Sequence, residues 1–154
     1  MVTEATAPLI VEEALRRAVA GDPIGGGQLL IPLIEDSRRE CFALCVMLAT
    51  AATYGMRPQG PDQLYALQVE DTRTGRRAAP GEMPPEVLFA ARFAAAWANR
   101  DGDGAQALFD ALADDMQTDA GQCRVIDGVI ALFGLAIARG RELAASQAPS
   151  EERS

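Results

Sequence analysis

The chain has 154 residues, with 14 basic residues against 22 acidic ones and a formal net charge of −8 at pH 7. Such a chain lacks the cationic footprint that phosphate backbones and anionic lipids require, so direct binding to nucleic acid or to a membrane surface is not expected. All fourteen basic residues are Arg and His is absent, a composition that indicates a gene from a GC-rich bacterium. The length suits one domain.

A first helix is predicted over residues 8–20, with a proline in its first turn and a glycine just after its end. Glu12 and Glu13 precede Arg16 and Arg17 by four residues. This spacing favours two ion pairs, and it places them on the face that points to solvent.

The glycine-rich stretch 21–27 is predicted to be a turn. A short second helix is expected over 28–34, where Pro32 fits a helix only in its first turn. The interior of this segment is therefore the least regular part of the first half.

The uncharged run 41–54 predicts a central helix. Ser37 supplies an N-cap with Glu40 three residues on, and Gly55 supplies the left-handed residue that ends the helix. Its apolar residues lie on every side at helical spacing, so neighbouring helices are expected to surround it.

Between residues 56 and 84 the composition changes to Pro, Gly, Arg and Thr. Within this stretch a period of two over 63–70 suits a strand, and a small β-hairpin is predicted near 63–79. An ordered connector without strand pairing is the alternative.

Three further helices are predicted in the second half, over 86–99, 105–116 and about 120–145, with Asp119 as the cap of the last. The first two suit an antiparallel helical hairpin. The last is apolar over a broad arc and contains three glycines, which favours close approach of another helix.

A shift of 78 residues aligns the two halves in helix order, and seven identical residues coincide. The predicted fold is therefore an all-α bundle of five or six helices, built as two pseudo-repeated three-helix units. One helical domain is expected over 1–146, with halves 8–55 and 85–146 joined by segment 56–84. Residues 147–154 are predicted to form a disordered tail.

The cysteines offer the first chemical candidate. Cys41 and Cys45 share one helical face, and Cys123 could approach them. A metal or cluster site normally needs four ligands, and no His completes one, so neither a metal nor a cofactor is predicted. Buried thiols that pack as small apolar groups are the better interpretation.

The densest acidic patch is predicted to bind a partner. Its members are Asp110, Asp114, Asp115 and Asp119. Like charges four residues apart destabilise a helix, so a basic partner surface or a cation could offset the cost. A solvated helix end beside Arg124 is the alternative.

No catalytic set emerges from these residues, since without His no Ser/His or Cys/His pair can form. The predicted function is a protein–protein interaction module of the bacterial cytoplasm, with self-association through helix 120–145. The chain shows no secretory signal, and the uncharged run 41–54 is shorter than a membrane span. A small-ligand- or metal-binding enzyme, with Cys41, Cys45 and Asp127 near its pocket, is one rival interpretation. An acidic antagonist of a nucleic-acid-binding protein is another.

Overall fold

Six α-helices and one 3-10 helix make up the regular structure of residues 6–56 and 80–147, which are the residues that the computed structural model describes. No strand occurs in those residues, and the predicted all-α bundle is confirmed. The predicted hairpin near 63–79 and residues 148–154 of the predicted tail lie outside the described part. The elements are α1 (Ala7–Val19), α2 (Pro23–Asp36), α3 (Arg38–Ala52), η1 (Pro80–Glu82), α4 (Pro85–Ala98), α5 (Gly102–Leu112) and α6 (Asp119–Ser146).

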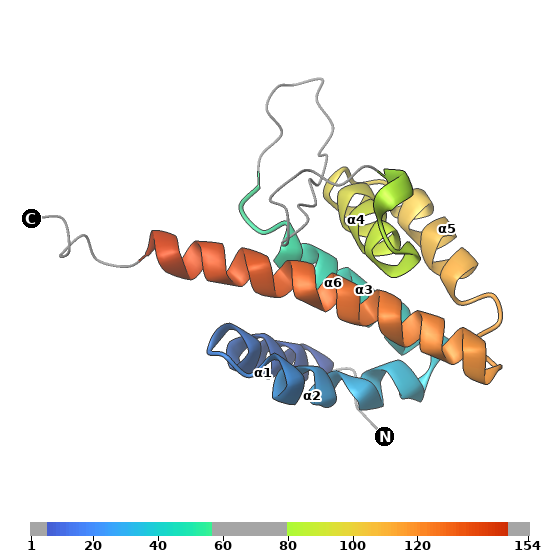
Figure 1. Cartoon of the computed structure of the whole chain (residues 1–154), viewed down its shortest axis with the longest axis horizontal. Helices are drawn as coiled ribbons and strands as arrows, with labels where there is room; N and C mark the ends of the chain where they lie inside the picture. Colours follow the sequence, from blue (N-terminus) through green and yellow to red (C-terminus); the bar gives the residue numbers. More distant parts are fainter. Residues whose placement is uncertain (1–5, 57–79, 148–154) are drawn as a thin grey trace, which may run out of the picture.

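The longest helix, α6, runs across the whole bundle (Figure 1). The pair α1 and α2 lies along one side of it and the pair α4 and α5 along the other, while α3 lies behind it and contacts it directly. The same order of elements therefore occurs twice along the chain: a helix, a sharp turn, a second helix and then a long apolar helix.

The two halves make the same corner between their first and second helices. In each, the amide of an aspartate donates to a carbonyl five residues earlier: Asp22 to Arg17 at 2.9 Å, and Asp101 to Ala96 at 2.9 Å. This bond is characteristic of a helix that ends with a left-handed residue. Equivalent residues of the corner are 79 positions apart, one more than the shift of 78 that the sequence alignment uses.

The same two aspartates cap the helices that follow. The Asp22 carboxylate accepts from the amide of Gly25, and the Asp101 carboxylate from the amide of Gly104, both at 2.9 Å. A Cβ at either glycine would stand about 2 Å from Oδ2 of the capping carboxylate, so a side chain there would displace the cap. Gly25, rather than Gly26, is thus the structural counterpart of Gly104.

The prediction of a turn over 21–27 followed by a short helix is wrong. α2 begins at Pro23, continues through three glycines and contains Pro32 in its interior. The Asp22 cap and a proline at the first helical position start the helix earlier. A Cβ at Gly26 would lie 2.4 Å from the Ala14 carbonyl oxygen, so close packing on α1 requires glycine there.

Two other helices begin or end at residues that differ from the sequence prediction. α5 begins at Gly102 and ends at Leu112, earlier than expected at both ends. The cap of α6 is Thr118, whose hydroxyl accepts from the Gly121 amide at 3.0 Å, and Asp119 is instead the first helical residue. For α3 the predicted cap is confirmed, because Ser37 Oγ accepts from the Glu40 amide at 3.1 Å.

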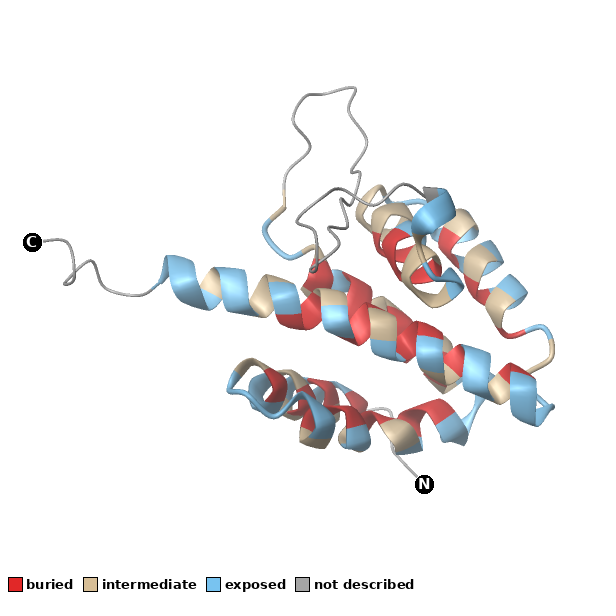
Figure 2. Cartoon of the chain, viewed as in Figure 1, coloured by how far each residue is buried: buried red, intermediate tan, exposed pale blue. Residues whose placement is uncertain are grey.

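One buried apolar cluster joins all six helices, and it is densest along α3 and the middle of α6 (Figure 2). Its largest fully buried side chains come from both halves: Leu30, Leu33, Ile34, Leu44, Leu48, Phe93, Phe109 and Leu132. Because these side chains pack together, neither half completes its core without the other.

α6 is long and apolar enough to cross a membrane by length and composition, the one such helix in the described residues. The sequence analysis considered only run 41–54 and missed this stretch. Here 44% of its most apolar window is buried inside the bundle, and a core helix passes the same test of length and composition.

Candidate functional site

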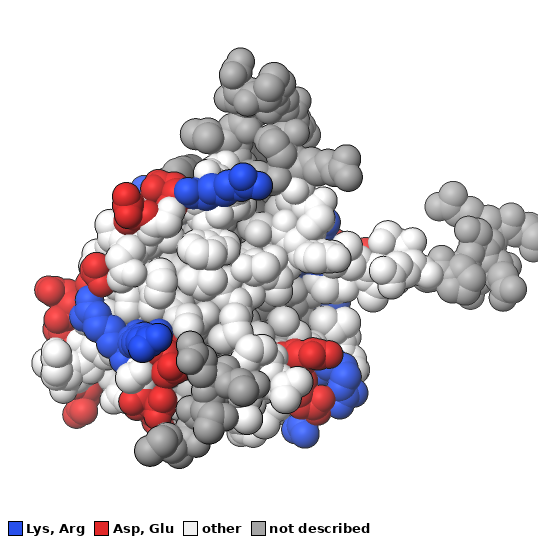
Figure 3. All heavy atoms as spheres, turned by 180° about the vertical axis from the view of Figure 1, so that it is seen from behind, with Lys and Arg blue, Asp and Glu red and all other residues white. Residues whose placement is uncertain are grey.

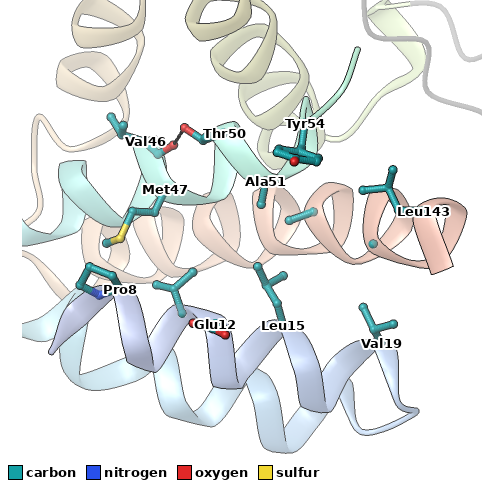
Figure 4. A pocket seen from close by; sticks show the side chains of 13 residues that line it. Pro8, Glu12, Leu15, Val19, Val46, Met47, Thr50, Ala51, Tyr54 and Leu143 are labelled. Carbon is teal, nitrogen blue, oxygen red and sulfur yellow. Dashed lines mark hydrogen bonds between the residues drawn. The ribbon is translucent and has the colours of Figure 1, made fainter. Parts of the chain in front are cut away.

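An apolar hollow of the surface lies between α1 and α3, with α6 as its floor (Figure 4). We name this hollow the Tyr54 lobe, and its volume is about 470 Å³. In Figure 4 Leu15 and Val19 of α1 and Met47 of α3 point into the gap between the two helices. Residues that define it include Val11, Leu15 and Val19 of α1, Met47 and Ala51 of α3, and Leu143 of α6.

A second hollow of about 470 Å³ adjoins the first, and Pro8, Val46 and Met47 line both. We name it the Trp97 lobe, because Trp97 of α4 forms its far wall, and we name the two lobes together the α1–α3 groove. Lining residues run from Arg39 to Ala51 along α3. At about 1.5 Å per residue the groove is about 18 Å long.

The face of the molecule that carries α3 is largely uncharged. Figure 3, which views the structure from the side opposite to Figure 1, shows a broad centre without charged side chains and Arg, Asp and Glu gathered toward its edges. Tyr54 belongs to the groove and is 66% exposed, so a large aromatic ring stands at its rim without cover. An uncharged hollow within a polar rim is the usual anatomy of a binding surface.

The groove exists because the two halves pack differently. α4 packs directly on α6 at Gly128, where a Cβ would stand 3.1 Å from the ring of Phe89. The corresponding helix α3 contains no glycine, and Val46 and Met47 line the hollow between it and α1. This hollow is the Tyr54 lobe.

Glu12 is the one charged residue that lines the Tyr54 lobe. The predicted ion pair from Glu12 to Arg16 is wrong, because Glu13 accepts from both Arg16 and Arg17 at 2.8 Å. These hydrogen bonds, that from Arg16 first, lower the pKa of Glu13 to about 2. Among the described residues, the carboxylate of Glu12 makes no ion pair.

The rim near Tyr54 holds an arginine whose charge is already engaged. Arg139 Nε donates to the Tyr54 carbonyl at 2.7 Å, and its terminal nitrogen donates to Glu142 at 3.0 Å. This arginine fixes the backbone that carries Tyr54, and it leaves Glu12 unneutralised on the opposite wall.

The predicted acidic patch is divided by the fold. Asp110 on α5 accepts from Arg38 of α3 at 2.8 Å, and this bond lowers the pKa of Asp110. Asp115 binds Arg124, which lowers its pKa in the same way. Two of the four carboxylates are therefore neutralised within the chain.

The other two members of the patch, Asp114 and Asp119, are exposed. Asp119 lies in the first turn of α6, where the helix dipole favours a carboxylate. Partner binding at Asp110, Asp114, Asp115 and Asp119 stays a prediction.

The three cysteines do not come together. Cys41 and Cys45 are fully buried, whereas Cys123 is exposed on α6, contrary to the expectation that all three are buried. A hydrogen bond between Cys41 and Cys45 lowers the pKa of Cys41 and raises that of Cys45, which burial raises further. Neither buried thiol lines the groove, and Asp127 does not either.

Within residues 6–56 and 80–147, no group of three His, Cys, Asp or Glu side chains is placed to hold a metal ion. The lining of the groove offers apolar contact, aromatic side chains at its rims, and three charged side chains: Glu12 in the Tyr54 lobe, and Arg39 and Glu40 in the Trp97 lobe. A largely apolar surface with a few charges can bind a partner.

A scan against protein-family models gives no match, and searches of the curated proteins and of the solved structures give no match either.

The sequence analysis missed the groove. Leu15, Val46 and Met47 belong to apolar helix faces that neighbouring helices were expected to cover. A helical period shows that a residue lies on an apolar face, and it does not show whether another helix covers that face. The one available signal was run 41–54 itself, which is apolar on more sides than two flanking helices can cover.

Proposed function

We propose that this chain is a protein-binding module of the cytoplasm whose α1–α3 groove receives an amphipathic helix of a partner protein. The observation that carries the proposal is the shape of the groove. It is apolar, open to solvent, and about 18 Å long along α3, which corresponds to about three turns of a docked helix. Amphipathic helices bind such grooves through apolar side chains at positions i, i+3, i+4 and i+7.

The charged residue of the Tyr54 lobe is Glu12, and its carboxylate favours a basic helix. Glu12 stands in the wall of the Tyr54 lobe without an ion-pair partner among the described residues, and the chain carries a net charge of −8. A Lys or Arg on the flank of the docked helix would pair with Glu12, and the overall field would speed the encounter. An acidic helix would meet repulsion at the same place.

The direct test is a titration with two designed peptides, one of Leu and Lys and one of Leu and Glu, both with the same helical apolar stripe. Trp97 is the single tryptophan of the chain and lines the groove, so its fluorescence reports occupancy. We expect the basic peptide to change the emission of Trp97 and the acidic peptide to leave it unchanged.

Two variants of matched exposure identify the binding surface. Tyr54, at 66% exposed, lies in the groove, whereas Leu9, at 65% exposed, lies outside both lobes. We expect Tyr54→Asp to weaken binding of the Leu/Lys peptide by about tenfold or more, since it places a charge against an apolar contact. Leu9→Asp should bind like the parent chain.

The role of Glu12 is tested separately by Glu12→Gln. An exposed ion pair contributes about 0.2–1 kcal/mol, so we expect a loss of affinity for the basic peptide of up to about fivefold. Equal affinity for the two peptides, or binding that Tyr54→Asp leaves intact, would contradict the proposal. A retained small apolar molecule in native mass spectrometry would favour a ligand pocket instead.

A further inference from the structure

One turn of α6 contacts the ends of both helices that form the walls of the Tyr54 lobe. Arg139 Nε donates to the carbonyl of Tyr54, just after the end of α3, at 2.7 Å. A terminal nitrogen of Arg141 donates to the Ala18 carbonyl, in the last turn of α1, at 3.4 Å. Carbonyls at a helix end have no partner within the helix, so these arginines supply one. We name residues 139–141 the α6 clasp, because they join this end of each wall to α6.

Gly140, the middle residue of the clasp, lets α1 approach α6 closely. A Cβ at this position would stand 2.8 Å from Val19 Cγ2. Valine is branched at Cβ, which restricts its χ1, so relief of the clash requires a shift of α1. Both residues line the Tyr54 lobe, and Figure 4 shows Val19 at the same end of the lobe as Tyr54. A residue without a side chain at position 140 therefore keeps the end of α1 close to α6.

Arg139 holds the other wall with a side chain that is itself fixed. That side chain is 19% exposed, and one terminal nitrogen donates to Glu142 at 3.0 Å. The other terminal nitrogen lies against Gly55, where a Cβ would stand 3.2 Å from it. The φ of Gly55 is 72°, a conformation that suits glycine, so the turn after α3 brings the backbone close to the guanidinium. The rim that carries Tyr54 is thereby tied to α6.

The separation of the two walls limits what the Tyr54 lobe can receive. The lobe lies between α1 and α3 with α6 as its floor, and the clasp joins each wall to that floor. A hydrophobic pocket discriminates by fit, and one methylene group more or less changes the outcome by about 10- to 200-fold. Walls that are fixed at one end therefore favour one size of apolar side chain over another.

We propose that the α6 clasp determines the specificity of the α1–α3 groove, because it sets the width of the Tyr54 lobe and thereby the size of the apolar side chain that a partner helix inserts there. The inference rests on the proposed function, since it concerns which helix the groove accepts. Arg139 and Arg141 act as positioning residues, and Gly140 acts through the space that it leaves for α1.

The test compares two designed basic peptides: the Leu/Lys peptide, and a Phe/Lys peptide with Phe at every position of the apolar stripe. Both are titrated by the emission of Trp97, to which Phe adds no signal. We expect Gly140→Ala to move α1 outward and to shift the ratio of the two affinities about tenfold toward the Phe/Lys peptide. Gly134→Ala is the matched control on the same helix. A Cβ there meets nothing within 4 Å, so the ratio should stay that of the parent chain.

Val19→Ala supplies a readout that a loss of stability alone would not move. Alanine at position 19 lacks the methyl group that a Cβ at position 140 would strike. We therefore expect Gly140→Ala to leave the ratio unchanged in a chain that already carries Val19→Ala, so that the two substitutions are not additive. Positions 19 and 140 line the Tyr54 lobe and not the Trp97 lobe, so the ratio reports on the former. Circular dichroism of each variant checks the fold.

Hydrogen exchange tests the clasp without any peptide. The Gly21 amide donates to the Ala18 carbonyl at 3.1 Å, at the end of α1. We expect this amide to exchange faster in Gly140→Ala than in the parent chain, and at the same rate with and without Gly140→Ala when Val19→Ala is present. Failure of both peptides to bind the parent chain would overturn the proposed function and this specificity with it. Peptides that bind with a ratio that Gly140→Ala leaves unchanged, or an unchanged exchange rate at Gly21, would overturn the role of the clasp alone.

Discussion

The indole N–H of Trp97 in α4 donates a hydrogen bond to Thr50 Oγ1 in α3, at 3.1 Å. The same hydroxyl donates to the Val46 carbonyl at 2.8 Å. Trp97 lines one lobe of the α1–α3 groove and Thr50 lines the other, so this pair joins the two lobes across the boundary between the halves of the chain.

Replacement of Thr50 by Val should remove this link and keep the shape of the side chain. We expect a loss of about 0.5–1.5 kcal/mol in the free energy of unfolding and a shift in the emission maximum of Trp97, whose N–H turns to water. Thr53→Val is the matched control, because Thr53 also donates to a carbonyl four residues earlier, at 2.8 Å, and has no partner on another helix. Equal effects of both variants on Trp97 would contradict the prediction.

Arg100 stands in a backbone conformation that suits glycine. Its φ is 60°, and the equivalent residue in the first half is Gly21 with φ of 110°. We expect Arg100→Gly to raise the free energy of unfolding by about 1 kcal/mol, since it relieves the left-handed strain of a residue with a Cβ. Gly21→Ala should lower it by a similar amount. Urea unfolding followed by circular dichroism measures both, and a destabilised Arg100→Gly chain would count against equivalent corners.

Close packing of α4 on α6 predicts opposite effects at two glycines of one helix. A Cβ at Gly128 would lie 2.9 Å from Leu112 Cδ2 and 3.1 Å from Phe89 Cδ1, whereas Gly134 has open space. We expect Gly128→Ala to destabilise the fold by about 1–3 kcal/mol and Gly134→Ala to stabilise it by up to about 1 kcal/mol. Unfolding at low protein concentration keeps self-association out of the comparison. Two variants of equal stability would show that α4 and α6 are less closely packed than described.

The helix boundaries were readable where a local signal decides them. The start of α3 is one such boundary, because the Ser37 cap depends on residues within a few positions. α2 was not readable, because three glycines and Pro32 weaken any local pattern. Its helix depends on the Asp22 cap and on contact with Ala14, which lies on another helix.

The candidate sites were less predictable than the helices for a related reason. The groove depends on the position of α1 relative to α3, and the spacing of apolar residues within either helix does not determine that position. The acidic patch shows the reverse case. Its four carboxylates are visible in the sequence, but Arg38, which neutralises Asp110, comes from 72 positions away in the sequence.

Acid should weaken the fold through Glu13. Its hydrogen bonds to Arg16 and Arg17 lower its folded pKa from 4.5 to about 2. A depressed folded pKa contributes stability above the unfolded pKa, and this contribution is lost as the pH falls from about 4.5 toward 2. We therefore expect the urea midpoint to drop less between pH 7 and pH 3 in Glu13→Gln than in the parent chain.

Glu12→Gln is the control for this pH series, because its carboxylate makes no ion pair within the described residues. It should keep the acid sensitivity of the parent. Asp110 and Asp115, whose pKa values their arginine partners also lower, contribute equally to all three chains. An unchanged pH dependence in Glu13→Gln would show that the ion pair does not form in solution.

Burial predicts how the three thiols react. Cys123 is exposed, whereas Cys41 and Cys45 are fully buried and share a hydrogen bond. We expect a thiol reagent to modify one cysteine rapidly in the native chain and all three after unfolding, since access limits the reaction. Cys123→Ser should abolish the rapid reaction. Rapid modification of three native thiols would show that α3 is less buried than described.

α6 contributes one side to the α1–α3 groove and another side to a separate hollow that lies between α2 and α6. Ala136 and Gly140 face the first, while Ile130 and Ile137 line the second. A substitution on either of these sides of α6 therefore alters one surface or the other. α1 lines only the groove, and α2 lines only the hollow between α2 and α6. A substitution in α1 can therefore alter the groove and leave the side of α6 that faces α2 unchanged.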